Sequence, residues 1–281
     1  SRLLADALDM PCHVIQCHRF PDGENKLTLP AELPRHVLFC RSLDHPNEKL
    51  LELLLAAKTA RALGAKTLTL IAPYLCYMRQ DKAFNPGEVV SQTIVGNFLA
   101  DLFDNVITVD PHLHRISHLN QAIPSNNAVS LSATTLMSEF LLKRLENPIL
   151  LGPDSESKQW VSAVAKPNNW EYVVCEKIRL GDRNVEITLP SINMHGRNVV
   201  IVDDVASSGK TLAVAAGKCI LKNAHQVDVL VTHALFSDDV KQDFLKAEVR
   251  HIWSTDSVSH ESNIIPLWGL LKQAILKLED R

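Results

Sequence analysis

The sequence predicts an α/β protein made of two tandem, doubly wound domains. Short apolar runs that fit buried strands alternate along the whole chain with longer stretches of helical periodicity. A polar stretch rich in small and turn-forming residues, IPSNNAVSLSATT at 123–135, divides this pattern into two similar halves. We therefore expect one domain at residues 1–127 and a second at 128–281.

The individual elements follow from the same periodicity. Apolar runs bounded by turn residues predict strands at 12–18, 36–41, 67–72, 106–109, 148–151, 172–175, 199–202, 227–233 and 249–253. Stretches with helical periodicity predict helices at 48–63, 89–102, 133–145, 157–164, 212–221, 238–246 and 265–278. In open α/β sheets, ligands bind beyond the carboxyl ends of the strands, so polar residues at these positions are the functional candidates.

Composition excludes several classes of function. The 281 residues are 46% hydrophobic and carry a formal net charge of -3, so the chain lacks the positive electrostatic potential that is typical of a protein that binds nucleic acid. The longest apolar run, at 68–78, is interrupted by Thr, Pro and Tyr and is too short to span a membrane. The first ten residues, SRLLADALDM, lack the apolar core of a signal peptide. Six scattered cysteines without a CxxC pair suit reduced thiols, and we expect a cytoplasmic enzyme.

A run of metal-type side chains near the start, CHVIQCH at 12–18, does not predict a metal site. Successive side chains of a strand face opposite sides, which separates Cys12 from Cys17 and His13 from His18. Pairs on one face, such as His13 and Cys17, would lie about 13 Å apart. We interpret these residues as ordinary strand residues.

The stretch VVIVDDVASSGKT at 199–211 predicts a phosphate site of a different kind from a P-loop. It ends in Gly-Lys-Thr, but Asp204 stands where a P-loop requires its first glycine. A strand, a loop of small residues and a helix start together make an anion site. Two acids directly before the loop suit the vicinal hydroxyls of a sugar. Asp203 and Asp204 are therefore candidates for a ribose diol, and the phosphate candidates are Ser207, Ser208, Gly209, Lys210 and Thr211. The alternative interpretation is a buried strand, a capped helix and two acids at the end of a sheet.

Four further polar stretches each follow a predicted strand. They are FPDGENKL at 20–27, PYLCYMRQDKAFNPGE at 73–88, VDPHLHR at 109–115 and GPDSES at 152–157. Each also has a purely structural interpretation; Arg79 and Asp81, for example, could form a surface ion pair. Their common placement after strands favours a site.

Five motifs in this order resemble the ribose-phosphate pyrophosphokinase family, also called phosphoribosyl pyrophosphate synthetases. They are FPDGE at 20–24, PYLCYMRQD at 73–81, VDPH at 109–112, CEKIR at 175–179 and VVIVDDVASSGKT at 199–211. The resemblance covers almost the whole chain. It implies two domains of the type I phosphoribosyltransferase-like fold, the first binding nucleotide and the second ribose 5-phosphate.

The resemblance also implies roles for individual residues. Phe20, Asp22 and Glu24 would contact the base and ribose of ATP across a subunit interface. Arg79, Gln80 and Asp81 would bind ATP at its phosphates and adenine. His112 and Asp154 would hold Mg²⁺, and Lys177 and Arg179, on a mobile flap, would stabilise the transferred diphosphoryl group. Asp203 and Asp204 would hold the ribose diol, while residues 207–211 would bind the 5-phosphate.

The reaction implied belongs to nucleotide biosynthesis. The anomeric hydroxyl of ribose 5-phosphate attacks the β-phosphorus of ATP, and AMP leaves. Such a transfer needs in-line positioning and charge neutralisation, which Mg²⁺, Lys177 and Arg179 would supply. The resemblance further implies a homo-oligomer, a dimer or a larger assembly such as a hexamer. Alternative functions are a phosphoribosyltransferase and a catalytically weak paralogue that regulates a true synthetase.

The chain departs from the family pattern at three places. Ser155, Glu156 and Ser157 follow Asp154 where small residues, often glycines, are usual, and Lys210 replaces a glycine or small residue. The family's first strand precedes the helix expected at 2–8, so we expect that the natural start is missing.

His114 and His118 would share a helical face if a helix began here, but no Glu-containing metal motif accompanies them. We therefore expect a metal role for His112 alone among these histidines.

Overall fold

The chain divides into two compact units. The computed structural model describes residues 1–180, 184–237 and 240–279. The first unit comprises Ser1–Leu131 together with the C-terminal segment from Leu267, and the second comprises Ser132–Pro266. The division expected at residue 127 falls on the first residue of a strand of the first unit, and the C-terminal helix belongs to that unit as well.

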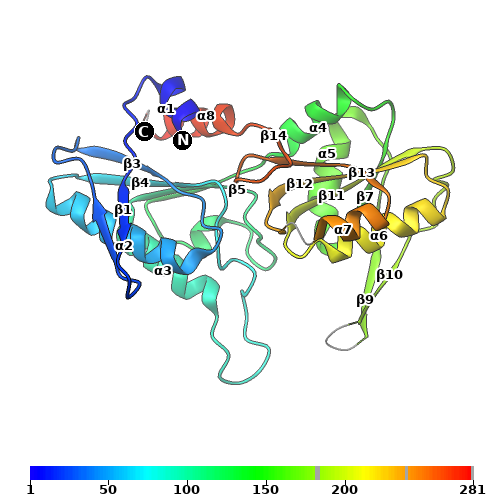
Figure 1. Cartoon of the computed structure of the whole chain (residues 1–281), viewed down its shortest axis with the longest axis horizontal. Coiled ribbons are helices and arrows are strands. Elements are labelled where there is room, and N and C mark those ends of the chain that lie inside the picture. Colours follow the sequence, from blue (N-terminus) through cyan, green and yellow to red (C-terminus); the bar gives the residue numbers. More distant parts are fainter. Residues whose placement is uncertain (181–183, 238–239, 280–281) are drawn as a thin grey trace. The chain divides into compact units, whose positions relative to one another are not determined.

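The first unit is built on a four-stranded parallel sheet. Its strands are ordered β3 (His36–Cys40), β4 (Thr67–Ala72), β5 (Asn105–Val109) and β6 (Asn127–Leu131). Figure 1 shows α2 (Pro46–Ala62) and α3 (Ser91–Leu102) on one side of this sheet, and α1 (Arg2–Leu8) and α8 (Trp268–Glu279) on the other. All five residues of β5 are buried, as expected for a parallel strand covered on both faces.

An antiparallel hairpin of β1 (Gln16–Arg19) and β2 (Asn25–Thr28) is attached to the first unit. The strand expected at 12–18 was wrong in its bounds, because β1 begins only at Gln16 and pairs with β2 alone. Every residue of β1 is exposed. A two-stranded hairpin is marginal in water on its own, so its position depends on the contacts described below.

The second unit is built on a six-stranded parallel sheet. Its order is β14 (Asn263–Ile265), β13 (Val249–Thr255), β12 (Gln226–Ala234), β11 (Asn198–Ala206), β7 (Ile149–Gly152) and β8 (Tyr172–Val174). In Figure 1, α4 (Thr134–Leu142) and α5 (Lys158–Ala165) cover one face, while α6 (Lys210–Leu221) and α7 (Lys241–Lys246) cover the other. A hairpin of β9 (Glu176–Leu180) and β10 (Asn184–Thr188) projects from this sheet (Figure 1).

Strand β6 and the second half of β11 were not expected from the sequence. β6 lies inside the polar stretch that was interpreted as a linker, where it pairs with β5 over five residues and Asn127 Nδ2 donates to Asn105 Oδ1 at 2.8 Å. The strand expected at 199–202 extends to Ala206, because β12 continues to pair with it through Asp203 and Val205. Pairing with neighbouring strands overrides the local polar composition in both cases.

Within the described part of the chain, no helix combines the length and the apolar character required to cross a membrane.

Candidate active site

The phosphate-loop candidate joins the end of β11 to the start of α6. Ser207 and Ser208 are exposed, and Gly209 is the residue that precedes the helix. Gly209 has a φ of 62°, in the left-handed region that favours glycine, and its carbonyl accepts from the Ala213 N–H at 2.9 Å. The loop therefore opens directly onto the first-turn N–H groups of a twelve-residue helix, which is the arrangement that binds anions.

Two acids precede this loop on β11. Asp204 is 1% exposed, and its Oδ1 accepts from the Val205 N–H at 2.8 Å. Asp203 Oδ1 accepts from the Asp204 N–H at 3.0 Å. Burial raises the pKa of Asp203 well above its ordinary value, and the negative charges of Asp204 and Asp154 raise it further. A carboxylate in such surroundings is stabilised by a ligand that brings hydroxyl donors or positive charge.

Asp154 lies close enough to this pair to act on it electrostatically. It follows β7, the strand next to β11 in the sheet, and its Oδ1 accepts from the Glu156 N–H at 3.1 Å. Ser157 Oγ donates to the Asp154 carbonyl at 2.6 Å. The unusual residues Ser155–Ser157 thus form a short 3₁₀ turn that Asp154 itself caps. The second unit therefore gathers three acids at the carboxyl ends of two neighbouring strands.

The thiol of Cys175 also lies near this acidic group. Burial raises the pKa of Cys175 to about 12, and the charge of Asp154 acts in the same direction. The thiol stays protonated near neutral pH, so it is not a nucleophile.

The expected catalytic pair lies on the projecting hairpin. Lys177 and Arg179 are on β9, where they are in register with Ile187 and Val185 of β10. Their side chains lie outside the part of the chain that the structure describes. The backbone hairpin was not expected as a pair of strands, although the motif itself was assigned to a flap.

In the first unit, the FPDGE motif forms the turn of the β1–β2 hairpin. The Phe20 N–H donates to the Glu24 carbonyl at 2.8 Å, and the Glu24 N–H donates to Asp22 Oδ1 at 3.2 Å. Phe20 is 41% exposed and packs edge-on against His18, with ring centroids 4.8 Å apart. The turn therefore presents an accessible aromatic ring beside two acids.

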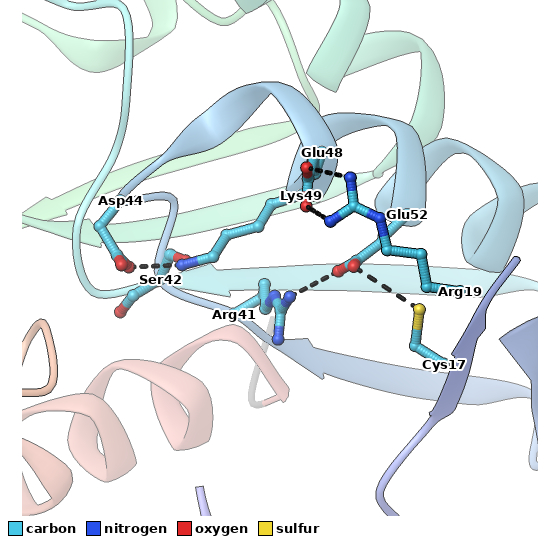
Figure 2. Close-up of polar contacts among 8 residues, drawn as sticks. All are labelled: Cys17, Arg19, Arg41, Ser42, Asp44, Glu48, Lys49 and Glu52. Atoms are coloured by element: carbon cyan, nitrogen blue, oxygen red, sulfur yellow. Dashed lines mark hydrogen bonds and ion pairs between the residues drawn. The ribbon is translucent and has the colours of Figure 1, made fainter. Parts of the chain in front are cut away.

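Ion pairs attach this hairpin and the end of β3 to α2 (Figure 2). Arg19 contacts Glu48 at 3.1 Å, Arg41 contacts Glu52 at 2.5 Å, and Cys17 Sγ lies 3.9 Å from Glu52. Each exposed pair contributes little; Arg19–Glu48 joins the hairpin to the helix, whereas Arg41–Glu52 joins the end of β3 to it.

A second contact orders the loop between β3 and α2. Lys49 Nζ donates to Asp44 Oδ1 at 2.6 Å and to the Ser42 carbonyl at 3.0 Å (Figure 2). Burial acts to raise the pKa of Asp44, but the hydrogen bond and positive charge of Lys49 outweigh it and hold that pKa below its ordinary value. The carboxylate therefore remains ionised and keeps the start of α2 attached to this loop.

The RQD motif lies in the loop before α3. Gln80 Oε1 accepts from Ser91 Oγ at 2.9 Å, and the Gln80 carbonyl accepts from the Gln92 N–H at 3.2 Å. The side chain of Asp81 is only 3% exposed and forms an ion pair with Arg115. The possible surface pair of Arg79 with Asp81 is thus replaced by a pair with a residue of the VDPHLHR stretch. Among the described residues, no hydrogen-bond donor reaches Asp81 Oδ2.

The VDPH motif follows β5 through a sharp change in direction. Asp110 is buried and has a φ of 38°, in the left-handed region, and its N–H donates to the Leu131 carbonyl at 2.8 Å. Residues 111–118 are not helical. His112 and His114 therefore do not lie on a helix, and their Nε2 atoms are 2.5 Å apart. The expectation from the sequence assumed that a helix begins here, which grouped His114 with His118 and left His112 apart, although the VDPHLHR stretch contains both His112 and His114.

Two family profiles match the chain. Residues 1–102 match the N-terminal domain of ribose phosphate pyrophosphokinase, and residues 121–263 match the phosphoribosyl transferase domain. The ribose-phosphate pyrophosphokinase of Methanopyrus kandleri is 33% identical over 262 residues, which are 92% of this chain and 88% of that protein. The chain belongs to the ribose-phosphate pyrophosphokinase family. A second member, from Methanothermobacter thermautotrophicus, is 30% identical over 95% of this chain and 93% of its own length.

The fold of the ribose-phosphate pyrophosphokinases is present as well. The crystal structure of phosphoribosylpyrophosphate synthetase from Mycobacterium smegmatis superposes with a TM-score of 0.85, at 20% identity, over 99% of this chain and 94% of that one. The expected fold class and the resemblance inferred from five motifs are both confirmed.

Proposed function

We propose that this family member transfers the β,γ-diphosphoryl group of ATP to the anomeric hydroxyl of ribose 5-phosphate. The products are phosphoribosyl pyrophosphate and AMP, and the enzyme is a ribose-phosphate diphosphokinase of nucleotide biosynthesis. The observation that carries the proposal is the sequence of two acids, a small-residue loop and a helix start at the end of β11. This arrangement suits a sugar phosphate, whereas a P-loop would leave Asp204 against phosphate oxygens.

The second unit would hold ribose 5-phosphate. Asp203 and Asp204 accept hydrogen bonds from the vicinal hydroxyls of the ribose. The 5-phosphate is bound by the backbone N–H groups and hydroxyls of Ser207, Ser208, Gly209, Lys210 and Thr211. The ammonium group of Lys210 adds a positive charge next to that phosphate, which is a favourable change from a glycine in this role.

The first unit would hold ATP. Phe20 offers a ring for stacking on the base, and Asp22 and Glu24 accept from the ribose hydroxyls. Arg79 binds phosphate oxygens, and Gln80 contacts the adenine. Asp81 Oδ2, which is buried and accepts no hydrogen bond from any described residue, has the geometry of an acceptor that a bound ligand completes.

Mg²⁺ fits the donor set of the second unit. Asp154, Asp203 and Asp204 offer carboxylate oxygens, which Mg²⁺ prefers, and the charges of Asp204 and Asp154 help to raise the pKa of Asp203. Asp154 in the second unit and His112 in the first would each serve as a ligand of Mg²⁺, which would neutralise charge on the phosphates of ATP. Lys177 and Arg179 would stabilise the charge that develops on the transferred group.

The exposed Phe20 supports an assembly of at least two subunits, up to a hexamer. In this proposal the FPDGE turn of one subunit completes the nucleotide site of another. ATP and ribose 5-phosphate are the ligands, and the enzyme works in the cytoplasm.

The test of the proposed function is AMP release from ATP, measured with and without ribose 5-phosphate. We expect release that depends on the sugar phosphate. Lys177→Ala and Arg179→Ala should each lower kcat by about two orders of magnitude with little change in either KM. Base-dependent consumption of phosphoribosyl pyrophosphate without AMP release would indicate a phosphoribosyltransferase instead. No turnover in the wild type, with both ligands bound, would indicate a regulatory paralogue.

A further inference from the structure

The backbone after β5 brings two imidazole side chains to one point. The Leu113 N–H donates to the Pro111 carbonyl at 2.7 Å, which closes a three-residue turn centred on His112. Residues two apart in an extended chain face the same side, and this turn shortens the distance between them. His112 and His114 are both half-buried, so each ring is held by the protein yet reached by solvent.

The two rings meet at their metal-binding nitrogens. The ring planes are perpendicular with centroids 4.1 Å apart, and the two Nε2 atoms are 2.5 Å apart. This separation is below the range of about 2.7–3.2 Å for ordinary hydrogen bonds from N–H groups. The two Nε2 atoms therefore converge on one point.

Two converging imidazole nitrogens are better ligands for a transition metal than for Mg²⁺. Mg²⁺ selects oxygen donors and keeps much of its water, whereas Zn²⁺, Ni²⁺, Cu²⁺ and Co²⁺ bind imidazole well. Metal–nitrogen distances of about 2.0–2.1 Å require the nitrogens to separate to about 3.3 Å for a tetrahedral ion. Small rotations of two partly exposed rings provide that change.

We propose that His112 and His114 form a two-imidazole site for a first-row transition divalent cation. The proposal rests on the metal role of His112 under the proposed function, gives that histidine a transition cation in place of Mg²⁺, and adds His114 as a second ligand. It replaces the expectation that His114 plays no metal role. The neighbouring Arg115 is engaged by the buried Asp81, so its cation is directed to that carboxylate.

His118 provides a matched control in the same stretch. It is exposed and precedes the 3₁₀ turn Leu119–Gln121, where its N–H donates to Gln121 Oε1 at 3.1 Å. Its imidazole is not one of the two rings that meet at their Nε2 atoms. Replacing His118 removes one histidine from the chain without touching the proposed site.

The test is calorimetric titration of Co²⁺ into tag-free protein without substrates, together with the visible absorption of bound Co²⁺. We expect His114→Ala to weaken the tightest Co²⁺ site by at least about tenfold and to reduce its absorption, whereas His118→Ala should match the wild type. His114→Asp, which substitutes an oxygen donor, should weaken Co²⁺ binding and preserve the fold. A hundredfold excess of Mg²⁺ should leave Co²⁺ bound to the wild type.

Three outcomes would overturn the proposal: Co²⁺ affinity unchanged in His114→Ala, an equal loss in His118→Ala, or displacement of Co²⁺ by up to a hundredfold excess of Mg²⁺. Circular dichroism of each variant separates lost ligands from lost folding. Because this measurement uses no substrate, its failure leaves the AMP-release test of the proposed function untouched, and the reverse also holds.

Discussion

Replacing Gly209 by alanine tests whether the phosphate loop is packed as the structure shows. A Cβ at this position would meet Val240 Cγ1 at 2.5 Å and the ring atoms Cε2 and Cζ of Phe244 at 3.1 Å each. Val240 and Phe244 are both buried, and a valine is stiff about its first side-chain torsion. The new methyl group therefore has no flexible neighbour to displace.

Two terms set the expected magnitude. The left-handed backbone at Gly209 makes alanine unfavourable by about 1–2 kcal/mol, and overpacking in a buried contact adds about 1–3 kcal/mol. Gly196 is a matched control, because its φ is 70° and a Cβ there would meet no heavy atom within 4 Å. Gly196→Ala therefore carries the backbone term alone, and the two variants share the same change in unfolded-chain entropy. The difference between them isolates the packing term.

The assay is thermal unfolding of both variants, followed by calorimetric binding of ribose 5-phosphate and of ATP. At about 2–4 °C per kcal/mol, Gly209→Ala should melt about 2–12 °C below Gly196→Ala. It should also lose affinity for ribose 5-phosphate while keeping that for ATP. Equal melting temperatures for the two variants would refute the packing of this loop against Val240 and Phe244.

Two further predictions follow from the same coordinates. Gly96→Ala in α3 should destabilise by more than about 3 kcal/mol in urea unfolding, because its Cβ would lie 1.8 Å from the Ala122 carbonyl oxygen. Gly217→Ala in α6 should instead stabilise by about 0.5–1 kcal/mol, because its Cβ would meet only Ala247, at 4.0 Å. A Gly96→Ala variant that is not destabilised, or a Gly217→Ala variant that is, would contradict these helix contacts. Asp203→Asn should raise the melting temperature near neutral pH and abolish ribose 5-phosphate binding. The folded-state pKa of Asp203 is raised, so ionisation of this carboxyl opposes folding increasingly as pH rises from the unfolded-state pKa of about 3.9 through the folded-state pKa. The gain in melting temperature of the variant should therefore disappear in acid. A gain that is independent of pH would exclude this cause.

The sequence was sufficient for the fold class, and it also predicted places where function would be found. Buried parallel strands such as Thr67–Ala72 and Asn105–Val109 are mostly apolar, so their local pattern carries the signal. The polar residues after these strands were equally visible, because the carboxyl ends of a parallel sheet share one edge. The family profiles and the relatives agree with the fold class and the family, and the roles of the site residues stay predictions.

Tertiary structure decided what depends on partners distant along the chain. β6 lies in a stretch rich in polar and turn-forming residues and becomes a strand because β5 offers a complete ladder of backbone groups. β11 extends through Asp203 and Asp204 because β12 continues beside it. Arg115 reaches Asp81 across 34 positions, and the turn at His112 brings His114 against it. Periodicity records only which side chains are buried by their own element. Pairing between strands and contacts between loops depend on the path of the backbone, which the local pattern does not contain.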